Sequence, residues 1–211
     1  MLILAAVQSH MYQEYRIAFS FVDTRCGICD LQPLCTLVKE WAANNGVKNT
    51  TDGGFNSYAL VLLVIHLLQS VASPPILPSL QKLFPDKYAR NVNGEIRFPM
   101  DVDFDDESFP DGGPEIESNS LTVAELFVSF LYYYSNFNFD RYYICMRDAA
   151  MKPRNGQDDG PANVSGNSVF IRDPIDDHNP GRTVRDIKFL QTKMRKTLHL
   201  FNSVDHIPVY R

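Results

Sequence analysis

The sequence is poor in the features that mark secreted or membrane-spanning proteins. It has only four cysteines (Cys26, Cys29, Cys35 and Cys145), too few and too unevenly spaced for a disulfide framework. Its most apolar stretch, YALVLLVIHLLQ from Tyr58, is well short of the roughly 20 residues that cross a bilayer. No basic residue precedes the apolar N-terminal run and no clear cleavage site follows it, so we expect no signal peptide. We therefore expect a reducing, cytoplasmic location, with the nucleus as an alternative, and no membrane partner.

Positive charge is also in short supply. The 20 Lys and Arg residues against 25 Asp and Glu give a net charge of -5, which argues against a generic nucleic-acid-binding protein. The charge is unevenly spread: residues 99–118 carry eight acidic and no basic residues, whereas residues 182–196 carry six basic residues and one acidic residue. One face of the molecule can therefore be basic although the whole chain is acidic.

The composition indicates a globular protein with a substantial core. The chain has 211 residues, of which 45% are hydrophobic. A chain of this length buries about 70% of the surface that it exposes when unfolded, so we expect it to fold without disulfides. Its patterns predict an α+β fold that is mostly helical. The expected helices span residues 2–22, 31–44, 56–71, 123–137 and 182–201, and the expected strands 141–147 and 168–173, with a polar loop at 152–167. The expected organisation is an N-terminal junction (1–30), a first part of the domain (31–82), an acidic loop (83–118) and a final part (119–211).

Three local signals support the helices. The period over residues 31–44 predicts a buried side that carries Leu34, Leu37, Val38 and Trp41. Asn56 is a candidate N-cap for the next helix, which is apolar nearly all round and so predicted to be central. Thr122-x-x-Glu125 has the pattern of a capping box.

Lys39, Ser57 and Tyr58 have the chemistry of a triphosphate site. An ammonium can meet phosphate charge, a hydroxyl at a helix N-terminus can donate to phosphate oxygens, and a tyrosine ring can support a base. The alternative is that Lys39 is a solvated charge and Tyr58 packs in the core. It stays open because any amphipathic helix carries such residues.

Several ordered segments give the chain a family resemblance. LVKEWA, NSYALVLLVIHLLQ, PPILPSLQ, VAELFVSFLYYYSNFNFD and IRDPIDDHNPGRTV follow one another in this order. In this the chain resembles the central domain of cytoplasmic poly(A) polymerases and terminal uridylyltransferases, which includes the PAP-associated domain. The likeness extends from about Leu31 to Thr197.

The resemblance implies roles for individual residues. Lys39 matches a lysine that contacts the triphosphate, Ser57 a phosphate-binding serine, and Tyr58 the tyrosine that stacks under the base. Asn56, beside Ser57, is expected to be part of the nucleotide-binding site as well. A second triphosphate lysine of some members falls on Ala43 here, which is expected to weaken nucleotide binding.

The same resemblance places base recognition in the turn 173–178. In members that prefer UTP this turn supplies a histidine to the base carbonyl and acidic residues to the opposite edge, and His178, Asp173 and Asp176 match these positions. A donating imidazole with carboxylates fits uracil and mismatches adenine. The turn is one residue shorter than in some uridylyltransferases. The alternative is that Asp173 and Asp176 cap the turn and that His178 is exposed to solvent.

The family's catalytic lobe has no counterpart in the sequence. Nucleotidyl transfer in this family uses Mg²⁺ or Mn²⁺ held by carboxylates, introduced by a Gly-Ser turn and an Asp-x-Asp strand. Asp101-Val102-Asp103 has the spacing but lies in an acidic loop after the lysine and tyrosine, so we read it as a solvated acidic run. Cys26-x-x-Cys29 lacks the further ligands of a zinc site. We assign no catalytic residue and no metal ligand, and expect a truncated or degenerate chain that is inactive alone.

The sequence therefore favours an RNA 3′-terminal nucleotidyltransferase domain of the uridylyl type, with the poly(A) polymerase type as an alternative. Expected ligands are UTP or ATP and an RNA 3′ end, not DNA. The expected RNA contacts are Arg182, Lys193, Arg195 and Lys196, although the run that includes Lys188 can equally be a solvated helix face. The other candidate function is a non-catalytic module that binds RNA or a regulatory protein.

Overall fold

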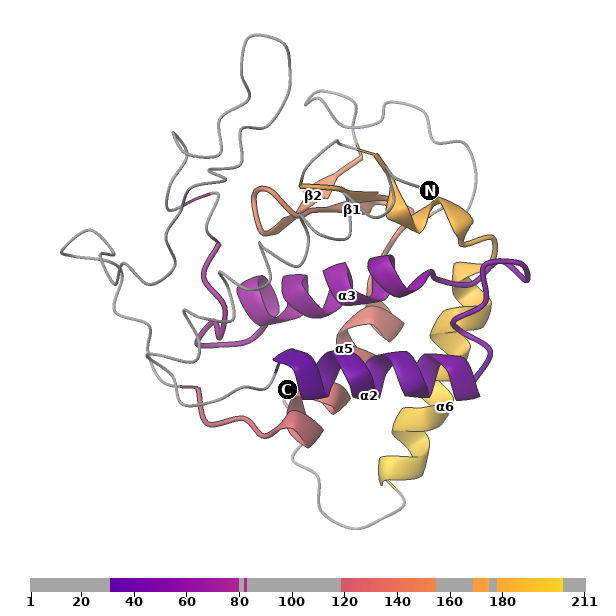
Figure 1. Ribbon diagram of the computed structural model, residues 1–211, viewed down its shortest axis with the longest axis horizontal. Helices are drawn as coiled ribbons and strands as arrows, with labels where there is room; N and C mark the ends of the chain where they lie inside the picture. The colour runs from indigo at the N-terminus through magenta and orange to yellow at the C-terminus, as the bar shows by residue number, and fades with distance from the viewer. Residues whose placement is uncertain (1–30, 80–81, 83–118, 155–168, 175–177, 203–211) are drawn as a thin grey trace, which may run out of the picture.

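The computed structural model describes residues 31–79, 82, 119–154, 169–174 and 178–202 (Figure 1). It confirms the mostly helical α+β class. The expected N-terminal helix, the acidic segment 83–118 and Asp176 lie outside the described residues. The elements are α2 (Leu31–Asn44), α3 (Ser57–His66), the π-helical turn η1 (Leu67–Val71), α5 (Val123–Asn136), β1 (Tyr142–Cys145), β2 (Ala150–Pro153), β3 (Ile171–Arg172), the 3₁₀ turn η2 (Pro180–Thr183) and α6 (Ile187–Asn202). None of the described helices has the length and apolarity needed to cross a bilayer.

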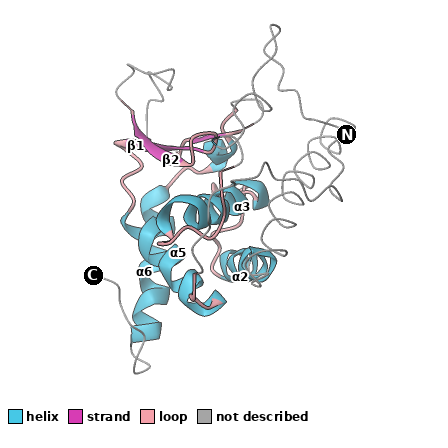
Figure 2. Ribbon diagram, turned by 90° about the vertical axis from the view of Figure 1, so that its left-hand side faces the viewer, coloured by secondary structure: helices cyan, strands magenta, loops and turns pink. Residues whose placement is uncertain are grey.

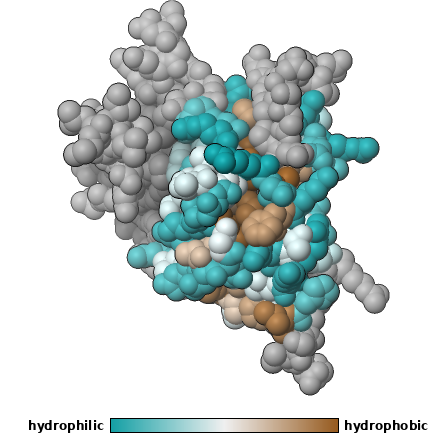
Figure 3. All heavy atoms as spheres, turned by 90° about the vertical axis from the view of Figure 1, so that its right-hand side faces the viewer, coloured by the Kyte–Doolittle hydropathy of each residue, from teal (hydrophilic) through white to brown (hydrophobic). Residues whose placement is uncertain are grey.

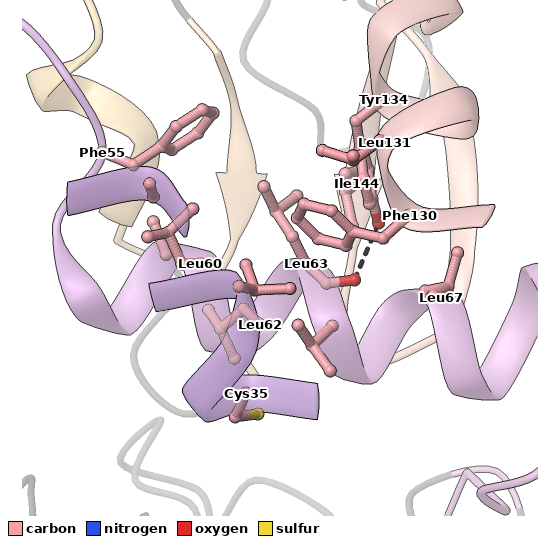
Figure 4. Close-up of a cluster of buried hydrophobic side chains, with 14 of the residues drawn as sticks. Cys35, Phe55, Leu60, Leu62, Leu63, Leu67, Phe130, Leu131, Tyr134 and Ile144 are labelled. Carbon is pink, nitrogen blue, oxygen red and sulfur yellow. Dashed lines mark hydrogen bonds between the residues drawn. The ribbon is translucent and has the colours of Figure 1, made fainter. Parts of the chain in front are cut away.

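Helix α3 is the central element, as its composition predicts. It lies between α2 and the small sheet (Figures 1 and 2). Leu60, Leu63 and Val64 of α3 are fully buried, and the core continues to Phe130 of α5 and Ile144 of β1 (Figure 4). A helix that is apolar on all sides must be covered on all sides, so α3 organises the elements around it.

Helix α2 confirms the predicted span, with one difference in its buried face. Leu34, Val38 and Trp41 are buried as expected, whereas Leu37 is 36% exposed. The prediction for Leu37 was wrong because the buried stripe runs through Leu34, Val38 and Ala42, and Leu37 lies at its edge.

Helices α5 and α6 form an antiparallel pair at the other side of the core. The Thr122 and Glu125 side chains make the predicted capping box at the start of α5. Near the start of α6, Gln191 donates to the Phe137 carbonyl at 2.8 Å, and near its end Phe201 packs edge-on against Phe127 at 6.2 Å. The two helices therefore run in opposite directions.

The sheet has the order β2-β1-β3, with β1 antiparallel to β2 and parallel to β3. Strands β1 and β3 fall within the expected segments but are shorter. Strand β2 was not predicted, because its residues Ala150–Pro153 contain no β-branched or aromatic side chain. Its pairing with β1, from Tyr142 opposite Pro153 to Cys145 opposite Ala150, makes it a strand.

A glycine pair brings the segment before α6 onto the loop before α3. Gly53 has a left-handed φ of +83°, and the Arg185 side chain lies against it. The Gly53 carbonyl accepts a bond from the Arg185 N–H at 3.0 Å, and the Gly54 carbonyl accepts one from the Thr183 hydroxyl at 2.9 Å. Helix α6 therefore begins at Ile187 instead of the expected Arg182: residues 180–183 form a 3₁₀ turn docked on this loop.

A buried histidine links α3 to α5. His66 is 1% exposed, and its Nδ1 donates to the Tyr134 hydroxyl oxygen at 2.8 Å because that hydroxyl itself donates to the Leu63 carbonyl. Burial lowers the pKa of His66 to about 4, so the ring is neutral in the folded protein.

His66 is expected to make stability fall with acidification. Its pKa is about 6.5 in the unfolded chain, so the unfolded state takes up a proton first as the pH falls. Between about pH 6.5 and 4 the fold should lose up to about 3 kcal/mol through this group. Denaturant unfolding of His66→Leu should show a weaker loss over this window. The exposed His199→Gln on α6 is the control and should behave like the parent; equal acid sensitivity of all three would contradict the assignment.

The Gly54 position should tolerate no side chain. A Cβ there would lie 2.3 Å from the Val47 carbonyl oxygen, so Gly54→Ala should cost about 1–3 kcal/mol in unfolding free energy. Gly46→Ala is the comparison, because Gly46 has φ +69° but open space around it. Its cost should come from backbone conformation alone, about 1 kcal/mol. A Gly54→Ala variant as stable as the parent would show that the loop can move away.

Candidate functional site

Asn56 ties the N-terminus of α3 to the turn before α6. Its Oδ1 accepts a bond from the Ala59 N–H at 2.7 Å, which confirms the predicted N-cap, and its Nδ2 donates to the Pro180 carbonyl at 2.9 Å. Ser57 follows at the exposed first position of α3. The first N–H groups of a helix point out of its end and attract anions, so Ser57 stands where a phosphate can be bound.

Asn179 holds the neighbouring turn in shape. Its Oδ1 accepts bonds from the N–H groups of Ile171 at 3.0 Å and Gly181 at 2.9 Å, and its Nδ2 donates to the Val169 carbonyl at 2.9 Å. Gly181 is required here, because a Cβ would lie 2.6 Å from the Val169 carbonyl oxygen. The three bonds fix both ends of the turn between β3 and η2.

Tyr58, Asp173 and His178 come together between α3 and this turn. The Tyr58 hydroxyl donates to Asp173 Oδ2, and His178 Nδ1 lies 3.6 Å from the same oxygen. The Tyr58 and His178 rings are stacked, with centroids 6.2 Å apart and planes inclined by 27°. The Asp173 N–H also donates to the His178 carbonyl at 3.1 Å. Three of the residues singled out in the sequence thus form one cluster; Asp176 lies outside the described residues.

Asp173 is the buried member of the cluster. Its exposed fraction is 1%, whereas the His178 side chain is 34% exposed and Tyr58 is half-buried. An ionised carboxylate at such a position costs several kcal/mol unless donors and cations surround it. The Tyr58 hydroxyl donates a hydrogen bond to this carboxylate and the His178 ring lies beside it, so Asp173 holds both rings in place.

Lys39 stands on the neighbouring helix α2, which packs against α3. It is half-buried and close enough to Cys35 to act on its thiol. Burial raises the pKa of Cys35 to about 12, and the Lys39 ammonium opposes only part of this rise. Cys35 is therefore an uncharged packing residue of α2. Ala43, at the position of the expected second lysine, is exposed.

The expected RNA contacts lie on η2 and α6. Arg182 is exposed and its Nη1 donates to the Asn179 carbonyl at 3.3 Å. On α6, Lys196 is exposed, Lys193 has its ammonium 5.2 Å from the Phe189 ring centroid, and Arg195 donates to a carbonyl of α5.

Three residues that position the site were missed in the sequence. Asn179 shapes the turn, while Thr183 and Arg185 dock it on the glycine loop. The Asn-Pro-Gly turn signal could have identified Asn179. No local pattern pointed to Thr183 or Arg185, because their partners are more than 120 residues away in the chain.

Within the described part of the chain, no group of three or more His, Cys, Asp or Glu side chains could hold a metal ion. Asp173 already faces Tyr58 and His178. Asp101 and Asp103 lie outside the described residues. The described residues therefore do not fit the divalent ions that nucleotidyl transfer in the resembled family uses.

Comparisons with known proteins match the fold and the ordered segments. Residues 122–179 match the family model for the PAP-associated domain of Cid1 family poly(A) polymerases. The chain is 33% identical over 166 residues to poly(A) RNA polymerase gld-2 homolog A of Drosophila melanogaster, which covers 74% of this chain and 11% of the relative. Mouse (Mus musculus) poly(A) RNA polymerase GLD2 is 30% identical over 161 residues, covering 74% of this chain and 30% of the relative.

Solved structures give the same result. A cytoplasmic RNA terminal U-transferase superimposes with a TM-score of 0.63 and 26% identity over 86% of this chain and 53% of its own. Cid1 in complex with its short product ApU gives a TM-score of 0.65 and 25% identity over 86% of this chain and 54% of its own. The chain thus spans about half of these structures and less than a third of the two curated relatives. It belongs to the RNA nucleotidyltransferase family that contains the Cid1-type terminal uridylyltransferases and the GLD2-type poly(A) RNA polymerases.

Proposed function

We propose that the chain is the nucleotide- and RNA-binding central domain of an RNA 3′-terminal nucleotidyltransferase that prefers UTP. The observation that carries the proposal is the cluster of Tyr58, Asp173 and His178 at the N-terminus of α3. It combines a platform for a base, a polar group for its edge and a helix end for phosphates.

His178 provides the preference for uracil. Its Nδ1 faces Asp173, so we assign the contact with the base to the Nε2 edge. We assign to His178 the tautomer that carries its ring proton on Nε2, which makes this edge a donor. An Nε2–H donor pairs with the O4 acceptor of uracil, whereas adenine presents an amino donor at the corresponding place.

Asp173 acts through its neighbours in this proposal. At 1% exposure it does not offer its carboxylate to the solvent, although the sequence favoured a direct or water-mediated contact with the base. It instead holds the Tyr58 and His178 rings in place, and any acidic contact to the base edge falls to Asp176.

The triphosphate is assigned to Ser57 and Lys39. Ser57 and the first N–H groups of α3 form an anion-binding helix end, and Lys39 on the adjacent helix α2 supplies positive charge. The metal-holding carboxylates and the chemical step are assigned to no residue of this chain.

A poly(A) polymerase is the second candidate, favoured by the names of the curated relatives. A non-catalytic module that binds RNA or a protein is the third. We expect a cytoplasmic location, with the nucleus as an alternative, and this part of the proposal rests on the resemblance and on the cysteine usage.

The proposal is tested by nucleotide binding and by incorporation onto an RNA 3′ end in the presence of Mg²⁺. The 211-residue chain should bind UTP. Lys39→Ala should weaken binding about 10- to 100-fold, the range for a hydrogen bond to a charged group. Lys48→Ala, in the exposed loop after α2, is the control and should bind normally.

The outcomes separate the candidate functions. Incorporation that Lys39→Ala abolishes would make the chain an enzyme by itself. UTP binding without incorporation would support a binding domain that needs its catalytic lobe. Absence of nucleotide binding would refute the proposal and leave the interaction module.

Base choice is tested by the ratio of UTP to ATP affinity. His178→Ala should narrow this ratio about 3- to 10-fold, because one base-specific hydrogen bond is lost. His199→Ala, an exposed histidine on α6, should leave the ratio unchanged. If the parent prefers ATP, the poly(A) polymerase candidate replaces ours; if His178→Ala leaves a UTP preference intact, another residue reads the base.

A further inference from the structure

Helix α6 has one face turned away from the core, and that face is strongly basic. The helix has 16 residues, IKFLQTKMRKTLHLFN, of which four are Lys or Arg and none is Asp or Glu. Ile187, Leu190, Gln191 and Met194 are buried. The outer face of α6 consists of Lys188, Phe189, Thr192, Lys193, Arg195, Lys196, His199 and Leu200.

Phe189 is the unusual member of this face. Its side chain is 50% exposed, and its backbone N–H is bonded at 2.9 Å by Asp186 Oδ1 at the start of the helix. The Lys193 ammonium, one helical turn further on, lies 5.2 Å from its ring centroid. The ring therefore stands near the capped start of the helix, with a cation over one of its faces. Figure 3 shows apolar side chains surrounded by hydrophilic ones on the side of the molecule where α6 lies.

We propose that the outer face of α6 is a second RNA-binding site, separate from the nucleotide cluster, on which Phe189 stacks against an unpaired base. Lys188, Lys193 and Lys196 neutralise the flanking phosphates. This inference rests on the proposal that RNA is the substrate, and it deepens that proposal by naming single-stranded RNA and the residues that hold it.

The composition of the face favours RNA over a protein partner. Lysine is depleted at protein–protein interfaces, whereas lysines interleaved with an exposed aromatic ring are typical of surfaces that bind single strands. Single-stranded RNA can use both features at once, because a base stacks on the aromatic ring while the phosphates lie along the lysines. No acidic side chain within α6 opposes a polyanion, although the whole chain carries -5.

The same features favour a single strand over a duplex. Stacking on Phe189 requires a base that is not already stacked within a helix. The deep, narrow major groove of duplex RNA does not admit side chains for base contacts, so a duplex could use only the charges of the face.

The face also continues from the proposed nucleotide site. The turn η2 is bonded to Asn56 at the N-terminus of α3, and α6 begins four residues after η2 ends. From Phe189 to Leu200 the helix extends about 16 Å away from that end. An RNA whose 3′ terminus is at the cluster thus finds a basic surface beside it.

The test measures RNA binding by the 211-residue chain with fluorescence anisotropy. The probes are a labelled oligouridylate of about 15 nucleotides and a duplex of the same length. Phe189→Ala should weaken single-strand binding about 5- to 100-fold and leave duplex binding nearly unchanged. Lys193→Gln with Lys196→Gln should lower the slope of log affinity against log salt by about 1.4. Met151→Ala, which removes another side chain about half exposed, is the control for Phe189 and should bind like the parent.

UTP binding by the same variants separates this inference from the proposed function. Phe189→Ala should bind UTP like the parent, whereas Tyr58→Ala should lose UTP and still bind RNA through α6. Single-strand affinity that is unchanged by Phe189→Ala overturns the inference, whatever the result with UTP. Equal weakening of single strand and duplex overturns the stacking role. Displacement of the RNA by a polyglutamate peptide with the same efficiency from parent and Phe189→Ala identifies a nonspecific anion surface instead.

Discussion

The docking of Asp173 and residues 178–185 on the N-terminus of α3 is the contact on which the candidate site depends. Four hydrogen bonds make it: Tyr58 to Asp173, Asn56 to Pro180, Thr183 to Gly54 and Arg185 to Gly53. They join segments more than 110 residues apart, so the chain entropy of closing a long loop must be offset before the site exists. The glycine pair lets the two backbones approach, and the apolar α3 beneath supplies the burial that holds them. The cluster is thus a product of the complete fold.

The buried carboxylate of Asp173 positions the two rings of the cluster. Asp173 is buried and shared between a hydroxyl and an imidazole, and this arrangement keeps the two partly exposed rings stacked. The chain is similar both to a protein named a terminal U-transferase and to proteins named poly(A) RNA polymerases. The fold alone therefore does not determine which base is preferred. In the proposed function that choice comes from the side chains around His178 and not from the core below them.

Helix α6 combines two roles through its periodicity. Its inner side carries Leu190, Gln191 and Met194, which pack in the core or bond to the end of α5. Its outer side carries the lysines and Phe189. Because successive residues turn by about 100°, one sequence of alternating apolar and basic residues separates into a structural and a basic side. An acidic chain can therefore present a local positive surface, since the field near a helix face is set by its nearest charges.

The sequence alone was sufficient for α2, α3 and α5, because apolar period, the Asn56 cap and the Thr122–Glu125 capping box are all local signals. It also supplied the order of segments from which the family resemblance was drawn, and the residue types of the cluster. It failed for β2, for the start of α6 and for Leu37, since each depends on what lies across from it: β1, the glycine loop and the edge of the α2–α3 contact. Only the tertiary structure decided that Asp173 is buried between Tyr58 and His178, and that Thr183 and Arg185 dock the turn. These are contacts between distant segments, and no local pattern encodes which partner a side chain will meet.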